Sequence, residues 1–262
     1  MIDYHCHILP GLDDGPSTLD ESIQMARLLS EAGFTSVYCT PHLIRNLYDA
    51  SRADVQRSIK TLQAALDRKG IALRLLAGRE YCLDNHCHEY LNDLMPLEGT
   101  RYLLIEIPSG SHQSMTLEII TTIMRKGFIP MIAHPERCRI LANHQSHKIP
   151  KSLGFFRRNT IRGRIEQEYS YQRIDLLDWL LGCECGFQCN VGSFAGMYGR
   201  SIREGAKRFW QQKVYTHYGT DAHSMEFLVK LTSEMRKTRS LTYSYLHSHR
   251  AGGVHAACAM TV

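Results

Sequence analysis

The chain has 262 residues, of which 44% are hydrophobic and 22% charged, and this length is typical of one large α/β domain with a substantial core. No apolar run of about 18 residues occurs, and no charged segment followed by an apolar stretch opens the chain, so we expect a cytoplasmic protein without membrane insertion. The net charge of +5 is compatible with an acidic or phosphorylated partner but lacks the clustered basic stripe of a nucleic-acid binder. Nine cysteines without zinc-ribbon spacing favour free thiols.

Helical and strand patterns alternate along the chain. In order, we expect a helix over residues 18–32, a strand over 36–40, a helix over 53–69, strands over 71–77 and 102–107, a helix over 115–126, strands over 128–133 and 187–191, a helix over 202–212 and a strand over 214–218. Repeated strand-helix units predict a parallel sheet with helices outside it, and in closed barrels of this kind the chemistry gathers where strands end.

Metal-binding residue types recur at these predicted strand ends. They are His7, His42, Glu80, Glu106, His134 and Asp221. In a strand, residues i and i+2 face the same side, so His5 can join His7, and His223 can join Asp221, at one ion. Asp14 adds a carboxylate in the Gly-Leu-Asp-Asp-Gly segment at residues 11–15.

Glu106 is the most diagnostic of these residues, because its strand is otherwise apolar. An ionised carboxylate in the segment Leu-Leu-Ile-Glu-Ile at residues 103–107 costs several kcal/mol without a partner. A metal ion is one natural partner, and a buried salt bridge to an arginine is the alternative.

The segment Asp-Tyr-His-Cys-His-Ile-Leu-Pro-Gly-Leu-Asp-Asp-Gly-Pro at residues 3–16 resembles the opening of the bacterial tyrosine phosphatases with a polymerase-and-histidinol-phosphatase (PHP) domain. Further segments resemble the remaining motifs of that family in order: Thr-Pro-His at 40–42, Gly-Arg-Glu at 78–80, Ile-Glu at 105–106, Ala-His-Pro-Glu-Arg at 133–137, Asn-Val-Gly-Ser at 190–193 with Gly196, and Asp-Ala-His at 221–223. The resemblance covers residues 1–143 and 172–224.

This resemblance implies an α/β fold of the distorted (β/α)7 barrel type and a site for up to three metal ions, usually Mn²⁺, with Fe or Zn as alternatives. By motif, His5, His7, Glu80 and Asp221 would hold one ion. Glu80, Glu106 and His134 would hold a second, and Asp14, His42 and His223 a third. Arg137 would contact the substrate phosphate through its guanidinium fork. A metal-activated water would attack phosphorus without a covalent enzyme intermediate.

The resemblance further implies a phosphotyrosine protein of capsule or exopolysaccharide control as substrate, with a bacterial tyrosine autokinase as the partner. Residues 1–224 would form the PHP-like catalytic domain, interrupted by a basic insertion at about residues 144–171. Residues 225–262 would form a divergent C-terminal helix and a flexible tail. The arginine that the family commonly has shortly after Asp-Ala-His is missing, since Ser-Met-Glu-Phe-Leu follows at residues 224–228.

Other functions use the same ligand types. They are a small-molecule phosphatase of the histidinol-phosphate type, a PHP nuclease and a catalytically dead metal-binding regulatory module. The spacing from Cys39 to Arg45 also matches the Cys-x5-Arg loop of cysteine-dependent tyrosine phosphatases. We interpret it as coincidence, because Pro41 removes one of the backbone amides that such a loop needs.

Overall fold

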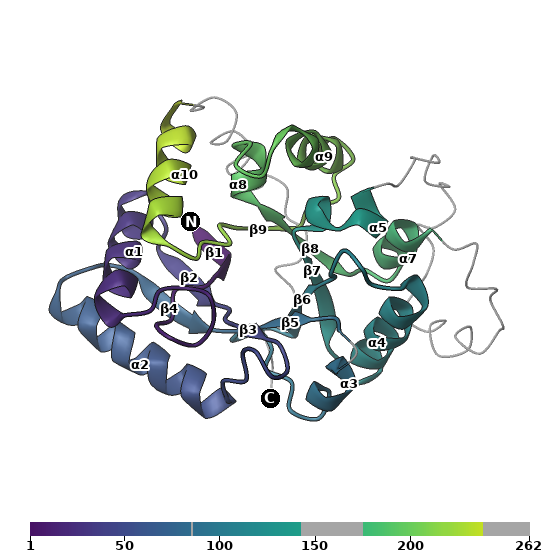
Figure 1. Ribbon diagram of the computed structural model, residues 1–262, viewed down its shortest axis with the longest axis horizontal. Coiled ribbons are helices and arrows are strands. Elements are labelled where there is room, and N and C mark those ends of the chain that lie inside the picture. Colours follow the sequence, from purple (N-terminus) through teal and green to yellow (C-terminus); the bar gives the residue numbers. More distant parts are fainter. Residues whose placement is uncertain (85, 143–174, 238–262) are drawn as a thin grey trace, which may run out of the picture.

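The computed structural model describes residues 1–84, 86–142 and 175–237 (Figure 1). Within these residues the strands are parallel and form two sheets. The smaller sheet has the order β1-β2-β4 and comprises Ile2–Cys6, Ser36–Cys39 and Arg74–Ala77. The larger sheet has the order β3-β5-β6-β7-β8-β9 and comprises His42–Leu43, Glu80–Cys82, Tyr102–Glu106, Ile129–Ala133, Gly186–Asn190 and His217–Gly219. The predicted α/β class with parallel strands is confirmed.

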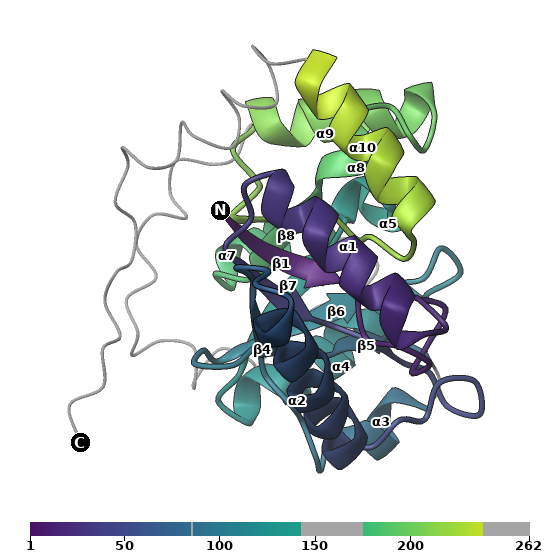
Figure 2. The ribbon, with the colours of Figure 1, turned by 90° about the vertical axis from the view of Figure 1, so that its left-hand side faces the viewer.

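Helices surround the strands in Figure 1. The longer ones are α1 (Leu19–Glu31), α2 (Arg52–Arg68), α4 (Gln113–Arg125), α9 (Arg200–Gln211) and α10 (Met225–Lys237). The shorter ones are α3 (Cys87–Tyr90), the 3₁₀ helix η1 (Pro135–Arg137), α5 (Arg139–Ala142), α7 (Leu176–Gly182) and α8 (Val191–Phe194). In Figure 2, α1 lies between α10 and α2. None of the helices described is long and apolar enough to cross a membrane.

Local sequence explains where the first two long helices begin and end. Thr18 and Glu21 form a capping box at the start of α1, and Ser51 and Asp54 form one at the start of α2. Beyond the last turns, Gly33 and Gly70 adopt positive φ values of 92° and 64°, which glycine tolerates without steric cost. These ends agree with the predicted helices to within one residue.

The two sheets meet at both of their edges. The pairing of β2 with β4 ends at Cys39 and Ala77. A few residues further along both strands of the pair, β3 continues from β2 and β5 from β4, and these two strands pair again with His42 opposite Glu80. At the other edge, β1 meets the segment after β9 through two backbone hydrogen bonds, from the amide of residue 221 to the carbonyl of residue 5 (2.7 Å) and from the amide of residue 7 to the carbonyl of residue 222 (3.0 Å).

Two large apolar cores hold the helices on the strands. One includes Val37, Leu62 and Leu66 and joins α1, α2 and α10 to the smaller sheet. The other includes Leu103 and Phe187 and joins α4, α7 and α9 to the larger sheet. The sheets therefore have a rigid apolar support on their helix-covered side, which leaves the strand ends free to carry polar groups.

Three details differ from the expected elements. Glu80 was expected just after a strand, but it begins the short strand β5. The strand expected over residues 71–77 begins only at Arg74, and the one expected over 214–218 is observed as His217–Gly219. The basic insertion expected at about 144–171 and the tail after residue 237 lie outside the described residues.

Candidate metal centre and active site

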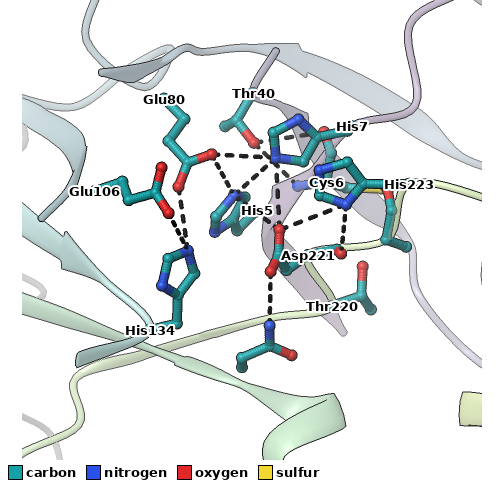
Figure 3. A network of polar contacts seen from close by, with 12 residues as sticks. His5, Cys6, His7, Thr40, Glu80, Glu106, His134, Thr220, Asp221 and His223 are labelled. Carbon is teal, nitrogen blue, oxygen red and sulfur yellow. Dashed lines mark hydrogen bonds and ion pairs between the residues drawn. The ribbon is translucent and has the colours of Figure 1, made fainter. Parts of the chain in front are cut away.

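The nine side chains singled out as metal ligands lie together, at or after the carboxyl ends of β1, β6, β7 and β9 and at the starts of β3 and β5. Figure 3 shows seven of them converging from different strands, and Asp14 and His42 complete the cluster. The ligand atoms form four overlapping groups with every atom within 4.8 Å of the others: His7, Asp14, His42 and His223; His5, His134 and Asp221; His5, His7 and Glu80; and His42, Glu80 and Glu106. The grouping differs in part from the expected one. His134 groups with His5 and Asp221, His7 joins the group of Asp14, and Glu106 groups with His42 instead of His134.

Glu80 occupies the centre of the cluster. Its Oε2 lies 3.2 Å from Nε2 of both His5 and His7 and 3.0 Å from Nδ1 of His42, and its Oε1 lies 3.3 Å from Nε2 of His134. The carboxylate is fully buried, and neither oxygen accepts a hydrogen bond of good geometry within the described part of the chain. A buried carboxylate without hydrogen bonds is costly unless a cation balances it.

Two neighbouring side chains fix how His5 and His7 present their rings. Gln188 Oε1 lies 2.9 Å from Nδ1 of His5, and its amide nitrogen is directed instead to the carbonyl of Cys189. Asp13 Oδ2 lies 2.7 Å from Nδ1 of His7. Because both partners are acceptors, each Nδ1 carries the proton and donates, as is usual for histidines that bind metal through the other nitrogen.

This assignment leaves the two Nε2 atoms as lone-pair donors that face each other. They are only 3.0 Å apart, and both lie near the Glu80 carboxylate and within 3.5 Å of Asp221 Oδ1. Two neutral imidazole lone pairs repel at this distance, whereas a cation between them and the carboxylates would bind them all. The donor set of imidazole nitrogen and carboxylate oxygen therefore fits a divalent transition-metal ion.

Electrostatics around the cluster favour positive charge. Burial opposes protonation of His5, but the Glu80 and Asp221 carboxylates outweigh burial and raise the pKa of His5 to about 9, so without a metal ion a proton on His5 takes the place that a cation would occupy. Burial likewise opposes ionisation of Asp221, yet the nearby His5, His134 and His7 lower its pKa to about 2. The carboxylates are thus ionised at neutral pH, and the potential between them attracts cations.

Two ligand-bearing positions have unusual backbone. His134 has a φ of 30° and Asp221 a φ of 52°, in the left-handed region that non-glycine residues rarely adopt. Each follows a strand, and the turn directs its side chain back into the cluster (Figure 3). Such strained positions concentrate at functional sites, where the surrounding structure holds them.

Asp14 and Glu106 lie at the solvent-facing side of the cluster. The Asp14 side chain is 49% exposed, and its Oδ1 lies 3.4 Å from Nε2 of His223. Glu106 is 25% exposed and lies 4.0 Å from Nε2 of His134. Leu103, Leu104 and Ile105 before it are buried, as expected. Among the described residues, the ion-pair partner of Glu106 is His134 and not an arginine.

Arg137 lies beside the cluster on η1. Its Nη1 donates to Asp221 Oδ2 at 2.6 Å, and its guanidinium carbon lies 4.7 Å from the centre of the Tyr198 ring. Asn190 also donates to Asp221 Oδ2, at 2.8 Å. The Arg137 side chain is 32% exposed, so part of the guanidinium group remains accessible to an anion.

Cys39, the cysteine of the Cys-x5-Arg segment, is not suited to act as a catalytic nucleophile. Cys39 is fully buried, and burial raises the pKa of its thiol well above the usual range, so the reactive thiolate is not populated at neutral pH. Arg45, expected to clamp phosphate in such a loop, pairs with Glu89 on α3. The structure agrees with the interpretation of this spacing as coincidence.

Sequence reasoning missed the side chains that orient the cluster. Asp13 is adjacent to Asp14 in the same motif, and its spacing from His7 gave no signal of a contact. Gln188 lies in an apolar strand and is 183 residues from His5 in sequence. Tyr198 follows the Asn-Val-Gly-Ser motif without belonging to it, so the sequence could indicate the neighbourhood of Tyr198 but not its stacking on Arg137.

Comparisons with known proteins agree with this geometry. The tyrosine-protein phosphatase YwqE of Bacillus subtilis is 28% identical over 228 residues, which cover 86% of this chain and 78% of YwqE. The putative tyrosine-protein phosphatase CapC of Staphylococcus aureus is 26% identical and covers 97% of this chain and 89% of CapC. A solved structure from work on YwqE and on CpsB of Streptococcus pneumoniae, described as unique metal-dependent tyrosine phosphatases, matches with a TM-score of 0.70 and 27% identity over 94% of this chain and 91% of that chain.

A sequence profile gives the family itself. The profile described as capsular polysaccharide synthesis, CpsB/CapC, matches residues 1–153. This stretch includes seven of the nine clustered ligands, all but Asp221 and His223, and ends beyond Arg137. The chain therefore belongs to the CpsB/CapC family of capsular polysaccharide synthesis.

Proposed function

We propose that this protein is a metal-dependent protein-tyrosine phosphatase that acts on a phosphotyrosine protein controlling capsule or exopolysaccharide synthesis. The observation that carries the proposal is the close approach of His5 Nε2 and His7 Nε2, 3.0 Å apart, beside the buried Glu80 carboxylate. Relatives named as tyrosine-protein phosphatases cover most of the chain and support the reaction class. A bacterial tyrosine autokinase is the partner that we propose.

The cofactor proposed is Mn²⁺, with up to three ions. Each of the four ligand groups contains at least one histidine. Mg²⁺ prefers oxygen ligands, so these imidazole nitrogens favour Mn²⁺, Fe or Zn instead. Glu80 would bridge two ions, because its two oxygens face different histidines. When bound, the ions would supply Lewis-acid activation of water and neutralise phosphate charge.

The chain's own residues prepare the site for a phosphate monoester. Arg137 offers an accessible guanidinium fork whose planar geometry matches two phosphate oxygens. Asp13 and Gln188 keep the His7 and His5 rings in one orientation, so the ligand atoms need little reorganisation. Phenolate is a good leaving group, with a pKa of about 10, and therefore needs less protonation than an alkyl alcohol.

We also propose that the two sheets are parts of one distorted (β/α)7 barrel. If β2 with β3 and β4 with β5 each count as one interrupted strand, seven strands follow in ring order. The hydrogen bonds between β1 and the segment after β9 support closure at the remaining edge. In this proposal residues 1–224 form the catalytic domain, and the protein acts in the cytoplasm.

A substrate panel tests the function. The purified protein, stripped with a chelator, is loaded with Mn²⁺ or Mg²⁺ and assayed on a phosphotyrosine peptide, histidinol phosphate and an oligonucleotide. We expect no activity without metal, greater activity with Mn²⁺ than with Mg²⁺, and fastest phosphate release from the peptide. Full activity in the metal-free protein would refute the metal mechanism, and faster turnover of histidinol phosphate or the oligonucleotide would refute the substrate class.

A further inference from the structure

A cavity of about 530 Å³ lies beside the metal centre, between the loop after β1, residues 47–50 and helix α2. Its lining includes Leu12, Leu47, Tyr48, Ser58 and Thr61, and we call it the α2 cavity. None of these residues belongs to the ligand cluster. Tyr48 also stacks on the ligand His42, with ring centroids 5.9 Å apart and 14° between the planes. The α2 cavity and the metal centre therefore share Tyr48 as a wall.

The segment that carries Tyr48 is a hydrogen-bonded hairpin. Ile44 and Tyr48 exchange both backbone hydrogen bonds, at 3.1 and 2.8 Å, and Asn46 takes the positive φ of 62° that closes the turn. The buried Arg79 side chain donates to the carbonyl of Ala50 and holds the far end of the segment. The backbone that carries Tyr48 is thus preorganised, so a ligand would not have to order this segment on binding.

The lining chemistry indicates what the α2 cavity can accept. Leu12, Leu47 and Tyr48 supply apolar surface, and Leu47 is 63% exposed at the rim. The lining also includes the carboxylates of Asp49 and Asp54 and the guanidinium of Arg57, which forms an ion pair with Asp54, so the two carboxylates disfavour an anion here. An uncharged apolar or aromatic side chain fits this lining better than a phosphate group.

We propose that the α2 cavity binds an apolar or aromatic side chain that flanks the phosphotyrosine in an extended peptide substrate, and that Tyr48 is the specificity-determining residue between the two sites. An extended chain advances about 3.3–3.6 Å per residue, so the 5.9 Å between the His42 and Tyr48 rings, which separates a metal ligand from the cavity wall, corresponds to about two residues. A peptide bound at the metal centre reaches the cavity, whereas a small aryl phosphate does not. This inference rests on the proposed function.

The test compares a peptide with a small substrate. Phosphotyrosine peptides with leucine or glycine at the flanking positions are assayed beside p-nitrophenyl phosphate with the Mn²⁺-loaded enzyme. Ser58→Trp fills the cavity from α2, Thr61→Trp fills it from a more exposed position, and Tyr48→Ala removes the shared wall. Gln56→Trp is the matched control, because residue 56 is exposed on the same helix and does not line the cavity.

We expect each of the three cavity variants to lower the ratio of kcat/KM for the leucine peptide to kcat/KM for p-nitrophenyl phosphate at least tenfold. These variants should also lose the preference for the leucine peptide over the glycine peptide. Gln56→Trp should keep both the wild-type kcat/KM ratio and the preference for leucine. Fluorescence anisotropy with a peptide containing the non-hydrolysable phosphonomethylphenylalanine should show the same loss of affinity without turnover.

An unchanged ratio and unchanged peptide affinity in Ser58→Trp and Thr61→Trp would overturn this inference while leaving the phosphatase function intact. A wild-type enzyme that releases no phosphate from any of the substrates would instead refute the proposed function.

Discussion

Replacing Glu80 with alanine should release more metal than replacing Asp14. Glu80 belongs to two of the four ligand groups, and its two oxygens face different histidines, whereas Asp14 belongs to one group at the exposed side. We therefore expect Glu80→Ala to lose up to two equivalents of bound Mn²⁺ and Asp14→Ala about one.

Activity should fall with the metal. If the lost ions supply about 3 kcal/mol of transition-state stabilisation, Glu80→Ala loses about a hundredfold in kcat or more. Asp14→Ala should retain more activity, because the groups around Glu80 remain complete.

The assay is elemental analysis after dialysis against a defined Mn²⁺ concentration, with circular dichroism to verify the fold. Glu80→Gln is the matched control for shape, since it keeps the side-chain volume and one carbonyl oxygen while removing the charge. Equal metal contents in Glu80→Ala and Asp14→Ala would show that Glu80 does not bridge two ions and would refute the layout.

Three other changes test different parts of the structure. Asp13→Asn should weaken metal affinity by about 10–100-fold, because the replacement disturbs the acceptor that orients His7, and a metal titration that matches the wild type would contradict this role. Cys39→Ser should keep activity within about tenfold, an allowance of roughly 1.4 kcal/mol, and a dead but folded and metallated variant would favour a cysteine mechanism. Burial lowers the pKa of His217 from 6.5 to about 4, so the unfolded chain binds a proton there that the folded chain excludes. Stability should accordingly fall between pH 6.5 and 4, by at most about 3 kcal/mol from this residue. His217→Gln should flatten the dependence of the urea midpoint on pH, and an identical pH profile would exclude that contribution.

Much of the fold was predictable because its elements have strong local signals. Capping boxes and terminal glycines mark α1 and α2, and apolar runs mark the strands from β6 to β8. The interruption that separates β4 from β5 has no periodic signal. At Gly78 an added Cβ would approach Leu97 within 2.7 Å, so this turn depends on close packing with a distant segment.

The late start of β9 also has a tertiary cause. The hydroxyl of Thr216 accepts a hydrogen bond from the amide of Phe187 at 2.8 Å. In a regular strand a backbone carbonyl would accept this hydrogen bond. A β-rich sequence over residues 214–218 cannot reveal that a side chain has replaced part of the backbone ladder. Local propensity therefore predicted the presence of this strand but not its boundaries.

The candidate ligands could be found from the sequence because most of them are His, Asp or Glu residues at or next to an apolar strand. Their orientation could not, since it depends on partners from other strands. Parallel register brings His42 opposite Glu80, and Gln188 from β8 accepts hydrogen bonds from both His5 and the amide of His134.

Gln188 therefore links ligands on two sides of the cluster through one amide oxygen. A change that only weakens its bond to His5 would also disturb the backbone of His134, which already has an unfavourable φ. Because one oxygen restrains both positions, their contributions to metal binding should be coupled, and substitutions at residues 5 and 134 should not be additive. The precision of the metal centre thus comes from shared hydrogen-bond partners between strands, in addition to the ligands that the sequence displays.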